Sequence, residues 1–310
     1  MGYVTRDEAA RRLLAGDVVA IPTETVYGLA ADATNAAAVA RIYAAKGRPD
    51  FNPLISHIAD PTQLAGLTLP DSRADRLAAA FWPGPLTLVL SRAPNCPVVA
   101  AVSAGLDSLA VRIPSHPLAR ELLAMVGRPV AAPSANRSGH VSPTTPEHVL
   151  ASLGPDMPVL DGGPCQVGLE STVVGLTGPQ PLLLRPGGIA VETIEAVLGE
   201  RLGHPQDAKL QSPGMLLKHY APALPLRLDA TAPLPGLREG LLSFGPVPAG
   251  FAAQYSLSAS GDAAEAAANL YAGLHALDRT DLQGIAVAPI PEAGLGAAIN
   301  DRLRRAARGR

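Results

Sequence analysis

The sequence predicts an α/β protein with a mixed, twisted sheet, followed by a linker and a smaller α/β unit. Helix and strand patterns alternate through the first two hundred residues. Several strand patterns follow one another without a helix between them, which is typical of a mixed sheet rather than a wholly parallel one. A polar stretch framed by Gly and Pro then interrupts the alternation. We therefore expect units at 1–202 and 223–310, joined by a linker at 203–222.

Local signals place the elements of the first unit. Thr5 and Glu8 form a capping-box pattern that opens a helix ending at Gly16. Gly47 ends an Ala-rich helix over 36–46, and Ser115 is expected to cap a helix that runs to residue 126. The other helices are expected over 71–81, 145–153 and 191–201. Short apolar runs predict strands over 17–21, 53–58, 86–91, 109–113, 129–132, 171–176 and 181–184.

The second unit is expected to be a small, open, Rossmann-like α/β structure. Strands are predicted over 224–228, 239–244 and 284–289, and helices over 262–277 and 295–308. The last helix carries a group of arginines, which are Arg302, Arg304, Arg305, Arg308 and Arg310. We interpret them as a solvated basic helix end favoured by the helix dipole, with an RNA-binding arm as the alternative.

Composition excludes several classes of protein. The 310 residues are 47% hydrophobic and 17% charged, as in a soluble globular protein. No apolar run approaches the roughly 18 residues of a membrane helix, and no apolar signal core opens the chain, so we expect a cytoplasmic protein without membrane association. Two cysteines provide neither a disulfide framework nor a zinc spacing. A net charge of −2 argues against a surface built throughout to bind nucleic acid.

The segment Lys46-Gly47-Arg48 is the first candidate functional site. A lysine and an arginine bracket the glycine at which a helix is expected to end. An ammonium and a guanidinium side by side suit a polyphosphate. Capping of the helix C-terminus by basic residues is the alternative interpretation.

Further candidates lie near the ends of predicted strands. Thr23 and Thr25 directly follow the first strand, at the kind of strand end where open α/β sheets bind ligands. Arg112 lies in an otherwise apolar strand, where its guanidinium needs a carboxylate partner from the protein or from a substrate. Ser108 lies four residues earlier and therefore on the same face of that strand. The alternative for the threonines is a turn in which they bond their own backbone.

Small polar residues follow other predicted strands. They are Ser134, Asn136, Ser138 and Ser142 after one strand, and Ser171 and Thr172 at the start of another. Arg185 ends a further strand before a Pro-Gly-Gly turn. A Ser/Asn-rich turn is the alternative for the first group, and a surface cap is the alternative for Arg185.

Several motifs of known chemistry do not occur in the sequence. It contains no G-x-x-x-x-G-K-[ST] phosphate loop, no G-x-G-x-x-G fingerprint, no H-E-x-x-H and no G-x-S-x-G elbow. Covalent catalysis and a zinc site therefore have little support. The remaining cations, hydroxyls and amides suit the binding and positioning of a phosphorylated ligand.

Taken together and in order, these segments resemble the threonylcarbamoyl-AMP synthase family in its two-domain form with a YrdC-like N-terminal domain. The matching segments are 22–29, 46–53 with His57, 110–114, 133–136, 170–174, 185–188, 212–222 and 294–302. The resemblance covers essentially the whole chain. It implies the synthesis of L-threonylcarbamoyl-AMP and pyrophosphate from L-threonine, bicarbonate and ATP, a nucleotidyltransferase reaction. This product leads to N6-threonylcarbamoyladenosine in tRNA, by way of a tRNA threonylcarbamoyl-transferase complex.

The resemblance also implies roles for particular residues. Those expected around threonine are Thr25, His57, Arg112, Ala132 through its backbone, and Ser171. Those expected around ATP are Arg48, Asn52, Ser108, Ser134, Ser142, Arg185 and Tyr220, with Lys46 and Asn136 at the phosphates. Lys46 and Arg48 are the expected catalytic residues, because they would offset charge on the leaving pyrophosphate together with Mg²⁺ carried by ATP. Residues 212–222 are expected to fold over the cleft as a lid.

Two alternatives from other classes remain. YrdC-like domains offer a basic concave face, which makes weak double-stranded RNA binding a second possible function. A carbamoyl-transfer domain of the hydrogenase-maturation type shares the fold, but it would bring zinc fingers for which two cysteines are too few. Threonine-dependent release of pyrophosphate distinguishes all three.

Overall fold

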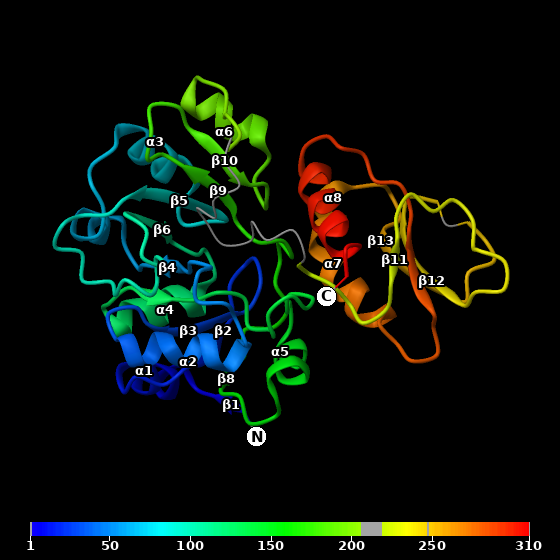
Figure 1. Cartoon of the computed structure of the whole chain (residues 1–310), viewed down its shortest axis with the longest axis horizontal. Coiled ribbons are helices and arrows are strands. Elements are labelled where there is room, and N and C mark those ends of the chain that lie inside the picture. The colour runs from blue at the N-terminus through cyan, green and yellow to red at the C-terminus, as the bar shows by residue number, and fades with distance from the viewer. Residues whose placement is uncertain (1, 206–218, 247, 310) are drawn as a thin grey trace.

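The computed structural model describes residues 2–205, 219–246 and 248–309. A larger N-terminal unit is built on a ten-stranded sheet, and a smaller C-terminal unit is built on a four-stranded sheet (Figure 1). The predicted α/β class with a mixed sheet and a second, smaller α/β unit is therefore confirmed.

The larger sheet combines parallel and antiparallel strands. Its spatial order is β1-β8-β2-β3-β7-β4-β6-β5-β9-β10. Strand β2 pairs antiparallel with β3, whereas β4 pairs parallel with β6. The strands in chain order are β1 (Tyr3–Val4), β2 (Val19–Ile21), β3 (Gly28–Asp32), β4 (Ile55–His57), β5 (Leu86–Ser91), β6 (Ser108–Arg112), β7 (Val130–Ala131), β8 (Val159–Leu160), β9 (Thr172–Gly175) and β10 (Leu182–Arg185).

The helices of this unit begin and end close to the predicted positions. They are α1 (Arg6–Leu14), α2 (Ala36–Lys46), α3 (Ser72–Phe81), α4 (Pro117–Val126), α5 (Pro146–Leu153) and α6 (Val191–Leu198), with a 3₁₀ helix, η1 (Pro61–Gly66). The Thr5 hydroxyl accepts a hydrogen bond from the Glu8 amide, as the capping pattern predicts. Gly47 ends α2 with φ 57°, a left-handed conformation that favours glycine. These local signals therefore predicted the helix ends well.

The C-terminal unit is a parallel sheet covered by two helices. Its strands, in the order β11-β14-β12-β13, all pair in parallel. The elements are β11 (Leu226–Arg227), β12 (Glu239–Phe244), β13 (Ala253–Ser258), α7 (Ala263–Leu277), β14 (Gly284–Val287) and α8 (Leu295–Ala306). In Figure 1, α7 and α8 lie between this sheet and the larger unit. Within the described ranges, no helix has the length and apolar character needed to cross a membrane.

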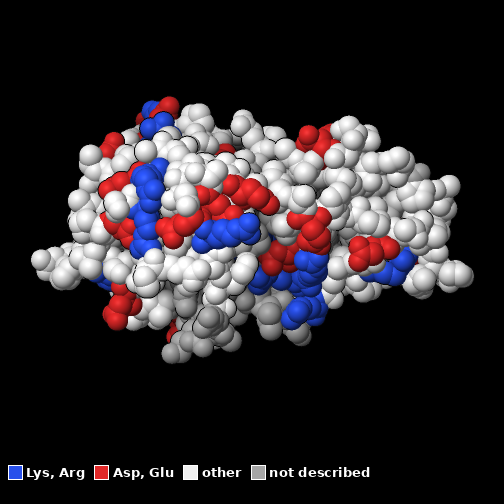
Figure 2. All heavy atoms as spheres, turned by 90° about the horizontal axis from the view of Figure 1, so that it is seen from above, with Lys and Arg blue, Asp and Glu red and all other residues white. Residues whose placement is uncertain are grey.

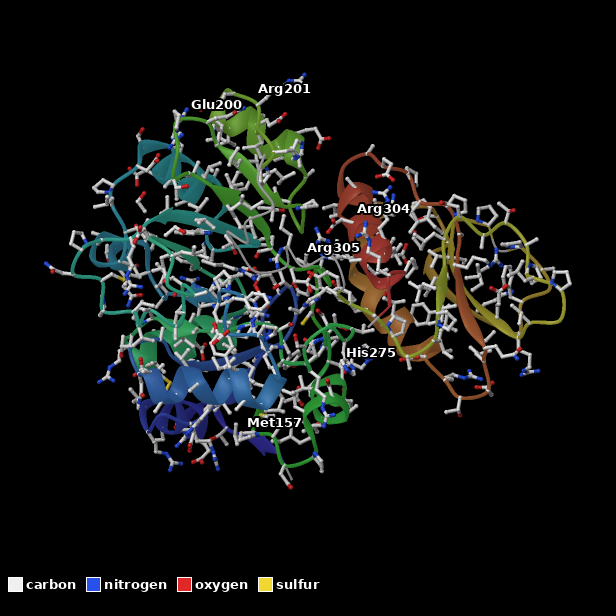
Figure 3. All side chains as sticks on the ribbon, in the orientation of Figure 1. Met157, Glu200, Arg201, His275, Arg304 and Arg305 are labelled. Carbon is white, nitrogen blue, oxygen red and sulfur yellow. The ribbon has the colours of Figure 1, made fainter. Side chains whose placement is uncertain are left out.

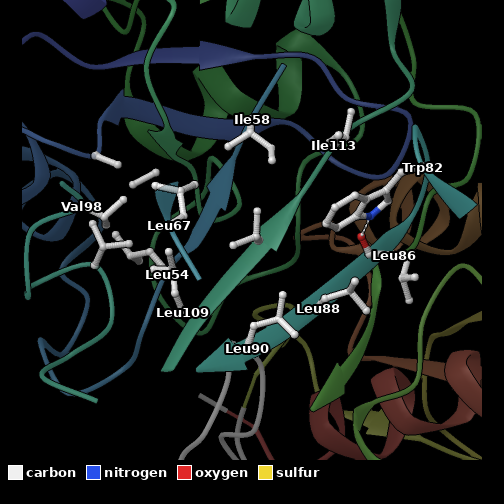
Figure 4. Packing of buried hydrophobic residues seen from close by; sticks show 14 of the residues in the cluster. Leu54, Ile58, Leu67, Trp82, Leu86, Leu88, Leu90, Val98, Leu109 and Ile113 are labelled. Atoms are coloured by element: carbon white, nitrogen blue, oxygen red, sulfur yellow. Dashed lines mark hydrogen bonds between the residues drawn. The ribbon is translucent and has the colours of Figure 1, made fainter. Parts of the chain in front are cut away.

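Separate apolar clusters stabilise the two units. Figure 4 shows part of the main N-terminal cluster, in which Leu88 and Leu90 of β5 pack near Leu109 of β6. The indole Nε1 of Trp82 donates to the Leu86 carbonyl oxygen at 2.8 Å, which satisfies its polar atom inside this core. A second cluster around α7 and α8 also includes Val26, Val141, Leu169 and Tyr220. The core of the C-terminal unit thus extends into the larger unit.

Several sequence predictions were incomplete or wrong. Strands β1, β3, β8 and β13 were not predicted, because they are short, Ala-rich or polar. The Ser115 cap was wrong, since His116 is the N-cap of α4 and the Ser115 amide instead donates to Glu24 Oε2 at 3.1 Å. The solvated helix end was wrong for Arg302, which is fully buried. Residues 206–218 of the predicted linker and lid lie outside the described residues, and the domain limits stay a prediction.

Candidate functional site

A pocket at the ends of several central strands gathers most of the predicted functional residues. Its lining comes from both halves of the larger sheet and from the end of the predicted linker. The lining residues are Thr23, Thr25, Val26, Gly28, Arg48, Ile55, His57, Arg112, Ala132, Pro133, Ser134, Glu170, Ser171, Arg185, His219 and Tyr220. All five residues predicted around threonine, and Arg48, Ser134, Arg185 and Tyr220 from the ATP set, therefore line one pocket.

Arg112 lies at the end of β6 and is held by three groups of the protein. Its Nη2 donates to Glu24 Oε1 at 2.6 Å, its Nη1 to Thr25 Oγ1 at 2.9 Å, and its Nε to the Gly84 carbonyl oxygen at 3.2 Å. A guanidinium has five N–H groups, so one N–H remains on each terminal nitrogen. Burial raises the pKa of Glu24, but the charge of Arg112 and the hydrogen bonds from Arg112 and the backbone together outweigh burial and lower that pKa below its usual value. The protein carboxylate that Arg112 needed is Glu24, and a two-pronged donor is left for a ligand.

The neighbouring strands bring His57 and Ala132 beside Arg112. His57 ends β4 and is paired in register with Arg112, while Ala132 directly follows β7. Burial lowers the pKa of His57 to about 3, so its imidazole is neutral at physiological pH. Thr23 and Thr25 lie in the loop between β2 and β3, and their hydroxyl oxygens are 2.8 Å apart. This half of the pocket combines one cation with hydroxyl and imidazole groups.

Because Gly28 has no side chain, the backbone of β3 can approach Ala132 and Ser134 closely. A Cβ built on Gly28 would lie 3.1 Å from the Cβ of Ala132, which is tighter than ordinary packing. Gly28 and Ser134 form a bridge between the two segments. A larger residue at position 28 would therefore push the pocket walls apart.

Ser171 and Arg185 form another wall. Ser171 precedes β9, and its hydroxyl lies 2.7 Å from that of Thr87. Arg185 Nη2 donates to the Ser171 carbonyl oxygen at 2.9 Å and to its hydroxyl at 3.1 Å. A Cβ on Gly187 would lie 2.3 Å from the Glu170 carbonyl oxygen, so only glycine fits beside this segment. Arg185 is 4% exposed, which excludes the surface-cap interpretation.

Arg48 and Lys46 are both buried, but only Arg48 lines the pocket. Arg48 donates to the carbonyl oxygens of Asn52 at 3.2 Å and Pro53 at 2.9 Å. Lys46 Nζ donates to the carbonyl oxygens of Ser134, at 2.5 Å, and Asn136. Lys46 is therefore not a simple cap of its own helix. It supports the segment 134–136, which forms the pocket wall.

Burial changes the acid–base properties of both cations. Burial lowers the pKa of Arg48 to about 10, and burial together with the nearby Arg48 charge lowers the pKa of Lys46 below its usual value. Among the described residues, their hydrogen-bond partners are carbonyl oxygens rather than carboxylates. The protein therefore balances these two positive charges only with the partial negative charges of carbonyl oxygens, and an anionic ligand beside Arg48 would supply a full negative charge.

The end of the predicted linker closes the pocket from the side of the C-terminal unit. Tyr220 is 1% exposed and has φ 65°, an uncommon conformation for a residue other than glycine. Its ring makes an edge contact with His219, with centroids 4.1 Å apart. Burial lowers the pKa of His219 to about 3.

The structure places five predicted ATP residues outside the pocket lining, namely Lys46, described above, and Asn52, Ser108, Asn136 and Ser142. Ser108 begins β6, four residues and about 13 Å along the strand from Arg112, so sharing a face does not bring it close. The Asn136 amide nitrogen donates to the carbonyl oxygens of Arg137 and His140, both at 2.9 Å. The Ser142 hydroxyl donates to Glu170 Oε1 at 2.7 Å. Asn52 is fully buried, and its amide oxygen and nitrogen have no partner among the described residues.

Sequence reasoning missed the two carboxylates of the site. Glu24 anchors Arg112, as described above. Glu170 lines the pocket and accepts hydrogen bonds from Ser142, Tyr271 and Arg302. Burial raises the pKa of Glu170, but Arg302 and Arg185 outweigh burial and lower it to about 2. In the sequence, each glutamate stands directly beside residues that were candidates because of their hydroxyl groups, Glu24 between Thr23 and Thr25 and Glu170 before Ser171.

Charge distinguishes the pocket from the outer surface. Three arginines and one glutamate are among the described lining residues, which is an excess of positive charge. On the face shown in Figure 2, by contrast, Lys and Arg lie among Asp and Glu. In the part of the chain that the structure describes, no group of three or more His, Cys, Asp or Glu could hold a metal ion. The arrangement suits an anionic ligand held by several positioned donors.

Comparisons with known proteins show which family the chain is similar to. A family model described as "Telomere recombination" matches residues 11–187, and one described as "Threonylcarbamoyl-AMP synthase, C-terminal domain" matches residues 189–308. The threonylcarbamoyl-AMP synthase of Bacillus subtilis is 44% identical over 98% of this chain and 93% of its own length. That of Pyrococcus abyssi is 42% identical over 96% of this chain and 92% of its own.

A solved structure gives the same result for the fold. The crystal structure of P. abyssi Sua5 complexed with L-threonine superposes with a TM-score of 0.90 at 39% sequence identity. The match covers 97% of this chain and 94% of that chain. Both units of the present structure are therefore shared with that protein. The chain belongs to the threonylcarbamoyl-AMP synthase family.

Proposed function

We propose that this protein makes L-threonylcarbamoyl-AMP and pyrophosphate from L-threonine, bicarbonate and ATP, for the N6-threonylcarbamoyladenosine modification of tRNA. One observation carries the proposal. The five residues expected around threonine share a single pocket with Arg48, Arg185 and Tyr220, which are expected around ATP. The threonine-bound P. abyssi relative supports the first of these substrates.

The pocket divides into two halves with different chemistry. Arg112 keeps one N–H on each terminal nitrogen and could bind a carboxylate with both, and hydroxyl and imidazole groups surround it. At the other half, Arg48 and Arg185 bring two guanidiniums whose charges act on each other. A triphosphate would relieve that repulsion. Threonine and ATP are therefore assigned to adjacent halves.

The reaction requires positioning rather than a protein nucleophile. The threonine amine takes up bicarbonate with loss of water to give a carbamate. A carbamate oxygen then attacks the α-phosphorus of ATP, and the bond to pyrophosphate breaks. Holding the two anions together in a buried site with fixed cations lowers the barrier, because the charge on the leaving group is already compensated.

The proposal assigns the cations to this step. Arg48 would contact the phosphates, and Lys46 would act through the 134–136 segment that it holds. Mg²⁺ would arrive on ATP and neutralise phosphate charge. The class of reaction is nucleotidyl transfer in the cytoplasm, and the product would pass to a tRNA threonylcarbamoyl-transferase complex.

Pyrophosphate release by the purified protein tests the proposal. Release should require threonine, bicarbonate and ATP together, and mass spectrometry should detect threonylcarbamoyl-AMP. Omission of each substrate in turn is the control. Release that is independent of threonine, or a product without the threonyl group, would contradict the proposal.

A further inference from the structure

Arg302 is a fully buried cation that the proposed reaction has not used. It lies in α8 of the C-terminal unit and is 0% exposed, whereas the side chain of Arg304 in the same helix is 57% exposed. Figure 3 labels Arg304 and Arg305 on this helix, beside the space where side chains of the two units meet. A buried arginine has to be held by specific partners, because removing its charge from water is costly.

Two of the partners of Arg302 line the pocket. Its Nε donates to Glu170 Oε2 at 2.8 Å. Its guanidinium carbon lies 5.2 Å from the ring centroid of Tyr220, within cation–π range. Its Nη1 donates to Asp301 at 2.8 Å, and its Nη2 has no partner among the described residues. One side chain of the C-terminal unit thus contacts two walls of the pocket at once.

Tyr271 of α7 reinforces the same two walls. Its hydroxyl lies 2.8 and 3.0 Å from the two carboxylate oxygens of Glu170, and its ring stacks with that of Tyr220 at 5.8 Å. A left-handed φ such as that of Tyr220 generally costs a residue other than glycine about 1–3 kcal/mol. The contacts with Arg302 and Tyr271 hold Tyr220 in this conformation. Glu170 and Tyr220 are therefore fixed chiefly by residues far from them in sequence.

Close packing makes this contact between the units rigid. A Cβ on Gly168 would lie 2.5 Å from the Ala267 carbonyl oxygen of α7, so the chain just before Glu170 touches the helix backbone. His275 of α7, labelled in Figure 3, stacks on His148 with ring centroids 3.9 Å apart. A displacement of α7 or α8 would therefore be transmitted directly to the pocket wall.

The walls in question belong to the half of the pocket that contains Arg48 and Arg185. Glu170 and Tyr220 line the pocket together with Arg48 and Arg185, and the charges of Glu170 and Arg302 influence the pKa of Arg185. The Arg112 half is instead held by Glu24, Thr25 and Gly84, all from the larger unit. A change at Arg302 should consequently affect one half of the pocket more than the other.

We propose that Arg302 is a positioning residue for the nucleotide, through which the C-terminal unit orients Glu170 and Tyr220. This inference rests on the proposed function, since it assumes that the Arg48 and Arg185 half binds ATP. It gives the C-terminal unit a role in the site without any direct contact between that unit and the reacting atoms.

The test compares Arg302→Gln and Arg302→Lys with Arg304→Gln, which makes the same chemical change at an exposed position of the same helix. We expect the KM for ATP to rise at least about tenfold in Arg302→Gln, with the KM for threonine changed less than about twofold. A mere folding defect would lower kcat through the active fraction and leave both KM values unchanged. Arg302→Lys keeps the charge beside Glu170 but loses the planar stacking on Tyr220, so it should restore stability more than ATP affinity. Arg304→Gln should match the unchanged protein.

Thermal unfolding with ATP or threonine separates this inference from the proposed function. The unchanged protein should be stabilised by each ligand, and Arg302→Gln should lose the shift with ATP while keeping the shift with threonine. Absence of an ATP shift in the unchanged protein would refute the proposed function itself. If Arg302→Gln does not fold, Tyr271→Phe provides the second test, because it removes only the hydroxyl that bonds to Glu170. It should raise the KM for ATP about threefold. An unchanged KM for ATP and ATP shift in both Tyr271→Phe and Arg302→Lys would overturn the inference.

Discussion

Replacing Arg112 by lysine separates its two possible roles, as ion-pair partner of Glu24 and as receptor for a substrate carboxylate. Arginine uses three N–H groups on Glu24, Thr25 and Gly84 and keeps one on each terminal nitrogen. Lysine has three N–H groups on a single atom. It can stay close to Glu24, but it cannot hold these partners and also present a two-pronged donor.

The size of the effect follows from the two N–H groups that are lost. Hydrogen bonds to a charged group contribute about 1.5–3 kcal/mol, and the lysine charge compensates part of that loss. We expect a loss of about 2–3 kcal/mol in threonine binding, which is roughly 30- to 150-fold in Kd. The Kd for ATP should change less than about threefold, because Arg48 and Arg185 lie in the other half of the pocket. The unfolding free energy should fall by only about 1 kcal/mol, since a positive charge remains beside Glu24.

Isothermal titration calorimetry with threonine and, separately, with ATP measures both affinities. Arg73→Lys is the matched control. Arg73 lies in α3, donates to Asp71 and to carbonyl oxygens of residues 176, 178 and 179, and does not line the pocket. It should lose a comparable amount of stability and keep normal threonine affinity.

A normal threonine Kd in Arg112→Lys would refute this reasoning. Arg112 would then act only as the partner of Glu24, and the threonine carboxylate would bind elsewhere in the pocket. A loss of ATP affinity equal to the loss for threonine would also contradict it, because that result would indicate general collapse of the site.

Three further predictions concern other groups of the site and the core. Arg48→Ala and Lys46→Ala should each lower pyrophosphate release at least about 100-fold, because each removes a fixed positive charge from this part of the site. Each variant should also destabilise the fold by about 2 kcal/mol, because each side chain is buried and donates to two carbonyl oxygens that would lose this donor; an unchanged urea midpoint in either variant would contradict this reasoning. Tyr220→Ala should weaken ATP binding at least about tenfold or release more free threonylcarbamoyl-AMP, and unchanged values of both in calorimetry and product assays would exclude a nucleotide contact. Burial lowers the pKa of His148 to about 4, so between pH 6.5 and 4 the unfolded chain binds a proton that the folded chain does not, and stability falls as the pH falls. At pH 5, His148 lowers the free energy of unfolding by about 2 kcal/mol relative to pH 7.5. In urea unfolding, the difference in unfolding free energy between pH 7.5 and pH 5.0 should therefore be about 2 kcal/mol smaller in His148→Gln.

Local sequence signals predicted the ends of helices better than they predicted strands and their pairing. The Thr5 cap and the Gly47 stop depend on bonds between near neighbours, and both match the structure. Strand β3 was not predicted, because Gly28–Asp32 is rich in Ala and Gly, which have low strand propensity. Its pairing with β2 and β7 supplies the stabilisation that propensity lacks.

The candidate site shows the same limit. Arg112 needed a carboxylate, and the sequence could not say which of the acidic residues would meet it, since Glu24 lies 88 positions away. Ser108 illustrates the opposite error, because parity along a strand predicts the face but not the distance. Capping of its own helix was one interpretation of Lys46, yet the side chain is buried and donates to carbonyl oxygens of the pocket wall.

Arg302 is the most informative difference between sequence and structure. In the sequence it is one of five arginines at the end of the chain, and a basic helix end in solvent is the ordinary interpretation. The position of each arginine around the helix axis decides whether it is buried or exposed. Arg302 lies on the same face as Ala298, Ile299 and Ala306, which are buried, whereas Arg304 pairs with Glu292. An arginine on an apolar helix face indicates a buried partner, and here that partner is a carboxylate of the pocket. The periodicity of α8 therefore contained the signal, and only the fold could show that the partner was Glu170.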